Sequence, residues 1–154
     1  MSRRSLYILL AAGGSAALLL GALGFQYLGG MAPCKLCYWQ RYPHVAAVLI
    51  GLAALFLTPR LAWAGALAAA TTSGLGLYHT GVERGWWQGP TTCSSQPIGG
   101  LSTDQLLDQI MAAPLVRCDE VAWQMLGLSM ASWNALASAA LAVIWILAAR
   151  RARA

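Results

Sequence analysis

Apolar residues along the chain gather into four long stretches, separated by short polar segments and by one long polar region. The first stretch, from Leu6 to Phe25, carries no charge and is rich in Leu and Ala. A helix of about 20 residues rises about 30 Å, which matches the hydrocarbon core of a bilayer. The pattern therefore predicts membrane-spanning helices over about residues 6–28, 43–58, 61–79 and 129–149.

Turn-forming residues mark the ends of these stretches. Two glycines follow the first, and Thr58-Pro59-Arg60 separates the second from the third because proline cannot continue a helix. The second helix is short unless it begins earlier, near Cys37. The outward loops are expected at about residues 29–42 and 80–128.

One piece of the long outward loop has the pattern of a short amphipathic helix. Ser102 can cap its start, and Gln105 follows at the capping-box spacing. Apolar residues then form one face: Leu106, Leu107, Ile110 and Met111. We therefore expect an all-α integral membrane protein, a four-transmembrane-helix bundle with a long extracytoplasmic loop. The loop helix either lies on the membrane surface or packs on the bundle.

Composition supports a membrane protein with one domain, residues 1–154. Hydrophobic residues make up 58% and charged residues 10% of the chain, whereas soluble domains carry about 25% charged residues. The net charge of +5 does not indicate nucleic-acid binding, because the basic residues lie mostly at the ends of apolar stretches. In membrane proteins such residues mark the orientation of the helices.

The basic residues also orient the predicted bundle. Six arginines lie in the N-terminus, the turn at residues 58–60 and the C-terminal tail, which are very short. The other side carries its basic residues over far longer loops, so the positive-inside rule places both termini in the cytoplasm. All four cysteines then face outward: Cys34, Cys37, Cys93 and Cys118. They permit two disulfides in three connectivities, and such bonds persist outside the reducing cytosol.

The segment Cys34-Lys35-Leu36-Cys37 is a candidate redox pair. Two cysteines at this spacing close a small strained ring, and the motif lowers the pKa of one thiol, so the pair oxidises and reduces readily. Arg41 follows Cys37 by four residues, and on a helix these positions share a face. Its guanidinium would then sit beside the Cys37 sulfur or beside whatever that sulfur attacks.

Three other interpretations compete with a redox pair. The two cysteines could form an inert structural disulfide. They could form half of a zinc site with Cys93 and Cys118, although 24 residues separate those two and zinc ligands usually come in closely spaced pairs. They could bind haem, but c-type attachment requires His after the second Cys, where Tyr38 stands.

The outer cysteines and one histidine are each open to two interpretations. Cys93 and Cys118 taken alone favour a structural staple, which would stabilise the fold by about 3 kcal/mol in the chain-entropy model. Beside a reactive pair, however, an exposed disulfide in a mobile loop can exchange with it through mixed disulfides. His79, at the outer end of the third span, is either a polar end-marker or a hydrogen-bond or proton donor to an acceptor near Arg41.

Residues 34–41, C-K-L-C-Y-W-Q-R, fit the pattern C-x-L-C-x-x-Q-R, which resembles the disulfide bond formation protein B family (DsbB). The resemblance covers the whole chain, because Tyr78-His79-Thr80 and Cys118-Asp119-Glu120 also look like that family's third-span end and approach to the last helix. It implies a quinone-dependent protein-disulfide oxidoreductase of the bacterial inner membrane, with its cysteines facing the periplasm. The quinone, ubiquinone or menaquinone, would be held or polarised by Arg41, with His79 nearby.

The same resemblance implies an order of electron transfer. A periplasmic DsbA-like thiol oxidase would be reoxidised, its thiolate attacking Cys93. Cys118 would exchange with Cys34, and Cys37 would deliver the electrons to the quinone. No metal takes part in this scheme.

Two rival functions are distinguishable. A related membrane oxidoreductase, such as one similar to vitamin K epoxide reductase, also uses C-x-x-C in a four-helix bundle but places it late in the chain. A tetraspan structural or metal-binding protein would instead hold two inert disulfides. Thiol trapping in living cells separates them, because only a redox enzyme shows a mixed or shifting cysteine state.

Overall fold

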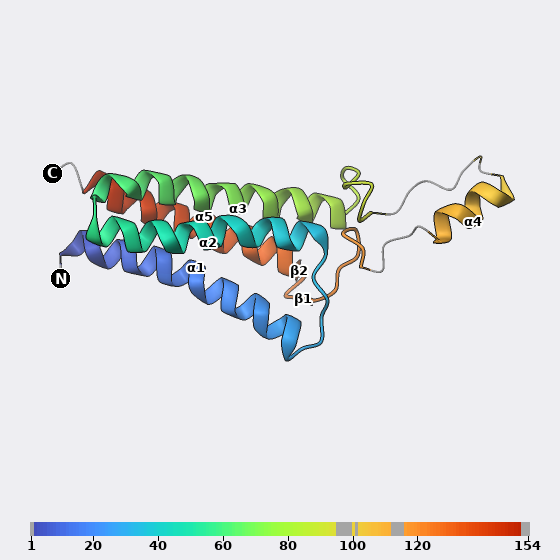
Figure 1. Cartoon of the computed structure of the whole chain (residues 1–154), viewed down its shortest axis with the longest axis horizontal. Helices are drawn as coiled ribbons and strands as arrows, with labels where there is room; N and C mark the ends of the chain where they lie inside the picture. The colour runs from blue at the N-terminus through green and yellow to red at the C-terminus, as the bar shows by residue number, and fades with distance from the viewer. Residues whose placement is uncertain (1, 95–99, 101, 112–115, 152–154) are drawn as a thin grey trace.

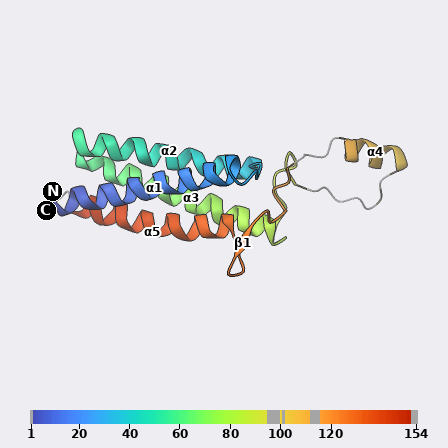
Figure 2. The same cartoon turned by 90° about the horizontal axis from the view of Figure 1, so that it is seen from below.

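The computed structural model describes residues 2–94, 100, 102–111 and 116–151. Its main body is a bundle of long helices that run side by side (Figure 1). They are α1 (Arg3–Tyr27), α2 (Lys35–Phe56), α3 (Ala62–Glu83) and α5 (Met130–Arg150), and the short 3₁₀ helix η1 (Pro59–Leu61) joins α2 to α3. The start of α1 and the end of α5 lie at one end of the bundle, and the connection from α3 to α5 leaves from the other, which we call the outer end (Figures 1 and 2).

Two of these helices, α1 and α5, are long and apolar enough to cross a membrane, with mean hydropathies of 2.0 and 1.7. The helices α2 and α3 have similar lengths but are less apolar, because α2 carries Gln40, Arg41 and His44 and α3 carries several hydroxyl residues. The structure therefore has a helix at each of the four predicted positions. That all four cross the membrane stays a prediction.

Small residues let α3 and α5 pack closely. A Cβ added to Gly65 on α3 would lie 2.6 Å from the ring of Trp145 on α5, which is completely buried. Nearer the outer end, a Cβ on Gly76 would lie 3.0 Å from backbone atoms of Ala131 and Ala135. Glycine permits these contacts without displacing the neighbouring atoms, and small residues at helix interfaces are the usual means of close packing in membranes.

The first turn of α2 holds the C-x-x-C pair. The helix begins at Lys35 rather than at about residue 43, as the alternative start near Cys37 anticipated. Cys34 is the N-cap, and its Sγ accepts a hydrogen bond of 3.2 Å from the Cys37 backbone N–H. The predicted membrane span begins at about residue 43, and Pro43 lies inside the helix. The first turn of α2 therefore precedes the predicted span.

The loop helix α4 (Thr103–Met111) projects beyond the outer end of the bundle in both views (Figures 1 and 2). A capping box opens it: the Ser102 N–H donates to Gln105 Oε1 at 2.9 Å, and the Gln105 N–H donates to Ser102 Oγ at 3.3 Å. None of its residues is buried. In this structure its apolar face therefore does not pack on the bundle, and contact with a membrane surface stays a prediction.

A small hairpin before α5 was not predicted. Strands β1 (Gln124–Met125) and β2 (Leu128–Ser129) pair antiparallel. The turn residues Leu126 and Gly127 have φ values of 53° and 76°, the left-handed region that two-residue hairpin turns require. Strands of two residues are too short to show alternation in the sequence, so no periodic signal marks them.

Candidate functional site

A cavity of about 370 Å³ lies at the outer end of the bundle. Its walls come from the second half of α1, the first turns of α2, the end of α3, the start of α5 and the segment before the hairpin. Most of the lining residues are apolar, and the polar ones include Cys34, Cys37, Gln40, Arg41, His79 and Glu83. A mostly apolar pocket of this size with a few polar groups is typical of a small-molecule site.

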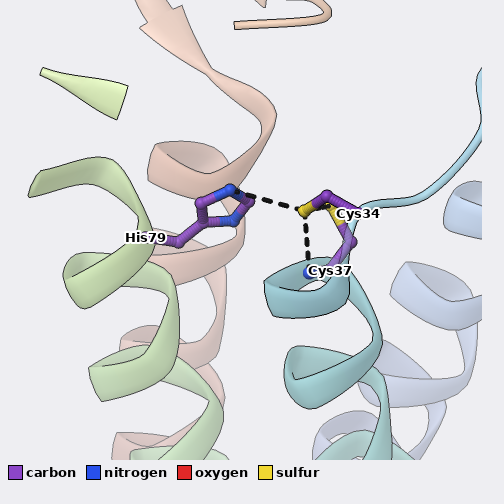
Figure 3. A group of neighbouring side chains, drawn as sticks. All are labelled: Cys34, Cys37 and His79. Atoms are coloured by element: carbon purple, nitrogen blue, oxygen red, sulfur yellow. Dashed lines mark hydrogen bonds between the residues drawn. The ribbon is translucent and has the colours of Figure 1, made fainter. Parts of the chain in front are cut away.

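The inner pair, Cys34 and Cys37, is present as two free thiols. Their sulfurs lie 2.8 Å apart in the first turn of α2 (Figure 3). Contact with Cys34 lowers the pKa of Cys37 to about 7; burial opposes this shift, and the Arg41 guanidinium favours it. The same contact, together with burial, raises the pKa of Cys34. The pair therefore favours one thiolate, on Cys37, beside a protonated Cys34.

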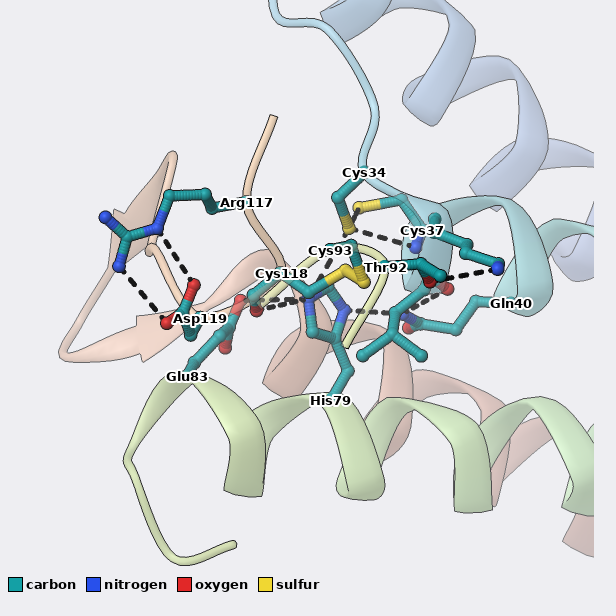
Figure 4. The surroundings of a disulfide bond; sticks show 12 residues. Cys34, Cys37, Gln40, His79, Glu83, Thr92, Cys93, Arg117, Cys118 and Asp119 are labelled. Carbon is teal, nitrogen blue, oxygen red and sulfur yellow. Dashed lines mark hydrogen bonds and ion pairs between the residues drawn. A yellow bond between two sulfur atoms is a disulfide. The ribbon is translucent and has the colours of Figure 1, made fainter. Parts of the chain in front are cut away.

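The outer pair, Cys93 and Cys118, forms a disulfide with a Cα–Cα distance of 5.3 Å. The expectation that this disulfide is exposed is wrong for this structure, because Cys93 is 2% and Cys118 0% exposed. Both pack with Cys34, Leu36 and Val82 in one buried cluster (Figure 4). The inner and outer pairs are thus neighbours rather than occupants of separate regions.

Hydrogen bonds join the two segments of the outer disulfide to each other and fasten them to the bundle. The Cys118 N–H bonds to the Cys93 carbonyl, and His79 Nε2 lies 3.2 Å from the Cys118 carbonyl oxygen. Lys35, inside the C-x-x-C segment, donates to Thr92 Oγ1 at 3.0 Å. These contacts explain why the loop folds back over the inner pair and buries its own disulfide.

His79 is held in one tautomer by a chain of amides. Gln40 Oε1 accepts from Asn134 Nδ2 at 2.8 Å, which turns Gln40 Nε2 toward His79 Nδ1 at 2.8 Å. Because Nδ1 accepts this bond, the proton lies on Nε2, which faces the Cys118 carbonyl and lies 3.6 Å from Cys34 Sγ (Figure 3). His79 is therefore a hydrogen-bond donor toward the cysteines.

Arg41 lines the cavity, and its guanidinium is held by α1. Its Nη1 donates to Gln26 Oε1 at 2.6 Å, and its Nη2 donates to the Ala22 carbonyl at 3.4 Å. The guanidinium also lies 5.2 Å from the centre of the Tyr38 ring. The charge acts on Cys37, as the helical spacing anticipated, but Gln26 fixes its position.

Three polar residues of the site were not identified from the sequence: Gln26, Asn134 and Glu83. Glu83 ends α3, and its side chain is 6% exposed. Its Oε1 lies 3.9 Å from His79 Nε2, and its Oε2 is buried with no hydrogen-bond partner. Burial raises the pKa of this carboxyl, against a hydrogen bond from Ser129 and the charge of Arg84. Its i+4 spacing from His79 was the available signal.

A four-cysteine zinc site does not form in this structure. Ligand atoms of Cys34, Cys37 and His79 lie within 4.8 Å of one another among the described residues. Structural zinc takes four ligands, but Cys93 and Cys118 are bonded to each other. The Nε2 that a metal would need is also turned toward the Cys118 carbonyl as a donor. The arrangement favours thiol-disulfide exchange over metal binding.

Comparison with known proteins places the chain in one family. A family model described as disulfide bond formation protein DsbB matches residues 3–148. A disulfide bond formation protein B of Methylococcus capsulatus is 36% identical over 132 residues, which cover 77% of this chain and 77% of the relative. One of Shewanella sp. (strain ANA-3) is 34% identical over 143 residues, covering 88% and 80%.

An uncharacterised protein of Rickettsia prowazekii is 31% identical over 116 residues, which cover 72% of this chain and 67% of the relative. No solved structure gives a significant match. The family model spans nearly the whole chain, and the paired cysteines lie together where the structure can exchange disulfides. The chain therefore belongs to the disulfide bond formation protein B family, as a membrane protein with disulfide oxidoreductase activity.

Proposed function

We propose that this protein reoxidises a periplasmic DsbA-like dithiol oxidase and passes the electrons to a membrane quinone. One observation carries the proposal: the two cysteine pairs pack in a single buried cluster at the wall of a mostly apolar cavity. A dithiol beside a disulfide can exchange electrons with it through mixed disulfides. A structural protein with two inert disulfides has no need of a free thiol pair at a cavity.

The electron path balances as two exchanges. The partner's two thiols reduce the Cys93–Cys118 disulfide: a partner thiolate attacks Cys93, Cys118 leaves as thiolate, and the partner's second thiolate then releases Cys93. Cys118 next attacks Cys34 of the oxidised inner pair, Cys37 leaves as thiolate, and Cys93 displaces Cys34. The result is an outer disulfide and an inner dithiol, the combination of redox states in this structure.

The cavity fits a quinone by its size and its donors. Arg41 and His79 Nε2–H are hydrogen-bond donors at the wall, and quinone carbonyls are acceptors. The apolar side chains of α1 supply a surface for a lipid tail. A bound quinone would accept two electrons and two protons from the dithiol. The residues would orient it and stabilise developing negative charge beside the Cys37 thiolate.

Access of the partner requires the loop to open. Cys93 is 2% exposed, so a soluble protein cannot reach it while the Lys35–Thr92 bond holds the loop over the inner pair. Opening breaks the exposed Lys35–Thr92 bond and separates Cys93 from the buried cluster that it forms with Cys34, Leu36 and Val82, a local unfolding of the loop. The partner's own contacts then replace those that are lost.

The proposed orientation places both termini in the cytoplasm of a bacterial cell and the outer end of the bundle in the periplasm. The cysteines lie at the end opposite to the arginine-flanked start of α1 and end of α5 (Figure 1). Alkaline phosphatase fused at Gly100 should be active, and the same enzyme fused after Arg153 should be inactive. The reverse pattern would exclude the orientation and with it the periplasmic partner.

The function is tested with purified protein, a reduced DsbA-like partner and ubiquinone, by following quinone absorbance. We expect quinol to form in proportion to the partner disulfide produced, one for one. A Cys93→Ala/Cys118→Ala double variant is the control and should turn over no partner. If that variant oxidises the partner at the wild-type rate, the outer pair is a staple and the inner pair acts on the partner directly.

A further inference from the structure

Oxidation of the inner pair needs a proton acceptor. Forming the Cys34–Cys37 bond releases an electron pair and the protons of both thiols. Cys37 loses its proton readily, because contact with Cys34 lowers its pKa to about 7. Cys34 keeps its proton, since contact with Cys37 and burial raise its pKa. A base in the cavity must therefore take the Cys34 proton as the sulfurs join.

His79 Nε2 lies 3.6 Å from Cys34 Sγ but is not that base in this arrangement. Its Nε2 already carries a proton, because Nδ1 accepts from Gln40 at 2.8 Å. Turning Gln40 over to reverse the tautomer would break its bonds to Asn134 at 2.8 Å and to the Leu36 carbonyl at 3.2 Å. The amide chain thus keeps His79 as a donor, and the proton needs another destination.

Glu83 has the position of that acceptor. Its carboxylate lies one helical turn beyond His79, with Oε1 3.9 Å from Nε2 (Figure 4). Its Oε2 is buried without a hydrogen-bond partner, and Glu83 lines the same cavity as Cys34 and Cys37. Burying a carboxylate oxygen without a partner is costly, so such a group marks a function more often than a structural contact.

Among the described residues that line the cavity, no other carboxylate has the burial and position of Glu83. Glu120 also lines the described wall, but its side chain is 63% exposed and lies 3.0 Å from Arg117. Helices α1 and α5 contribute no charged residue to the described lining. The titratable and charged groups that share the described lining with Glu83 are Cys34, Cys37, Arg41, His44, His79, Arg117 and Glu120, and Arg84 acts on Glu83 from the next position. Among them, Glu83 is the buried carboxylate.

We propose that Glu83 is the proton-transfer residue of the inner cysteine pair, a role that rests on the proposed function. As the Cys34–Cys37 bond forms, the electron pair passes to the acceptor, and the Cys34 proton moves to Glu83 through a water in the cavity. Glu83 then donates this proton to the acceptor. The acceptor's second proton comes from solvent and replaces the one that Cys37 released, so two electrons and two protons are transferred.

The test compares Glu83→Gln, which removes the charge at nearly constant volume, with Asp108→Asn as the control, because Asp108 is an exposed carboxylate on α4 that does not line the cavity. Reduced full-length protein is mixed with ubiquinone of one isoprene unit, and single-turnover oxidation is followed across the pH range. At about pH 6 we expect Glu83→Gln to be roughly 100-fold slower and Asp108→Asn to match the wild type. Below the pKa values of both Cys37 and Glu83, the slope of log rate against pH should fall from about two to about one, because one of the two required deprotonations is gone.

Two further measurements separate proton transfer from structural damage. Alkylation of Cys37 should be as fast or faster in Glu83→Gln, because the carboxylate charge raises the Cys37 pKa. Acetate should restore oxidation in Glu83→Ala in proportion to its concentration, since a small base can enter the space that is left. A slow variant with an unchanged slope and no rescue by acetate would show that Glu83 is structural and would overturn the proposal.

The outcome also distinguishes this proposal from the proposed function. If wild-type protein forms quinol and Glu83→Gln does so at the same rate, Glu83 is not the acceptor and the function stands. If wild-type protein forms no quinol, the function fails. The azo oxidant diamide, which also takes two electrons and two protons, then tests Glu83 alone: the same loss of slope supports its role, and an unchanged profile overturns it.

Discussion

The pH at which Cys37 becomes reactive should report the contacts of the inner pair. Contact with Cys34 lowers the pKa of Cys37 to about 7, whereas an unperturbed thiol titrates at about 8.5. At about pH 7 the thiolate fraction therefore rises from about 3% to about 50%, roughly a 15-fold gain. A thiolate of lower pKa is also a weaker nucleophile. With a Brønsted coefficient of about 0.4–0.5, its rate constant for alkylation falls roughly four- to sixfold.

The net effect is an alkylation rate only about threefold above that of an ordinary thiol at about pH 7, so the midpoint of the pH profile is the diagnostic quantity. The sign follows from a depressed pKa: reactivity is present above about pH 7 and is lost as the pH falls through that value. Reduced protein in detergent is treated with iodoacetamide across the pH range. Mass spectrometry then gives the rate at Cys37, because Cys34 is only 5% exposed.

Cys34→Ala should move the Cys37 midpoint upward, since it removes the largest cause of the shift. Cys34→Ser is the control, because its hydroxyl can still donate to the thiolate and should hold the midpoint below that of the alanine variant. A wild-type midpoint near about 8.5, or one that Cys34→Ala leaves in place, would refute the reasoning.

Three further outcomes are expected. Arg41→Ala should raise the KM for quinone roughly tenfold, as expected for loss of a charged hydrogen bond, with little effect on the partner's KM. Cys118→Ala should accumulate a mixed disulfide between Cys93 and the partner, seen on a non-reducing gel, because the Cys93 thiolate attacks the disulfide of the oxidised partner and Cys118 is no longer present to displace the partner. Gly65→Ala should destabilise the bundle by about 1–3 kcal/mol in a detergent unfolding assay, because its Cβ would lie 2.6 Å from the Trp145 ring.

Each of these has a matched comparison. If the partner's KM rises in Arg41→Ala while that for quinone is unchanged, Arg41 belongs to the protein interface. Cys93→Ala should give no trapped complex, and a complex of equal yield would reassign the attacked cysteine. Gly74→Ala is the control for the packing variant, because a Cβ at Gly74 on the same helix meets nothing within 4 Å. Equal losses at the two glycines would exclude close packing as the cause.

The sequence by itself determined the elements that depend on neighbouring residues. Four apolar stretches predict the four long helices, because helix length and apolar character are local properties. The Ser102–Gln105 capping box opens α4 with the predicted pair of hydrogen bonds. The motif C-x-L-C-x-x-Q-R, together with Tyr78-His79-Thr80 and Cys118-Asp119-Glu120, indicated the family, which the family model shows.

Tertiary structure decided how these elements meet. The outer disulfide is buried against Cys34 because the loop returns to the start of α2, a packing that spacing along the chain does not encode. Gln26 and Arg41 pair across α1 and α2, and Asn134 on α5 orients His79 through Gln40. Such contacts join residues far apart in the sequence, so they depend on how the helices pack, which local patterns do not specify.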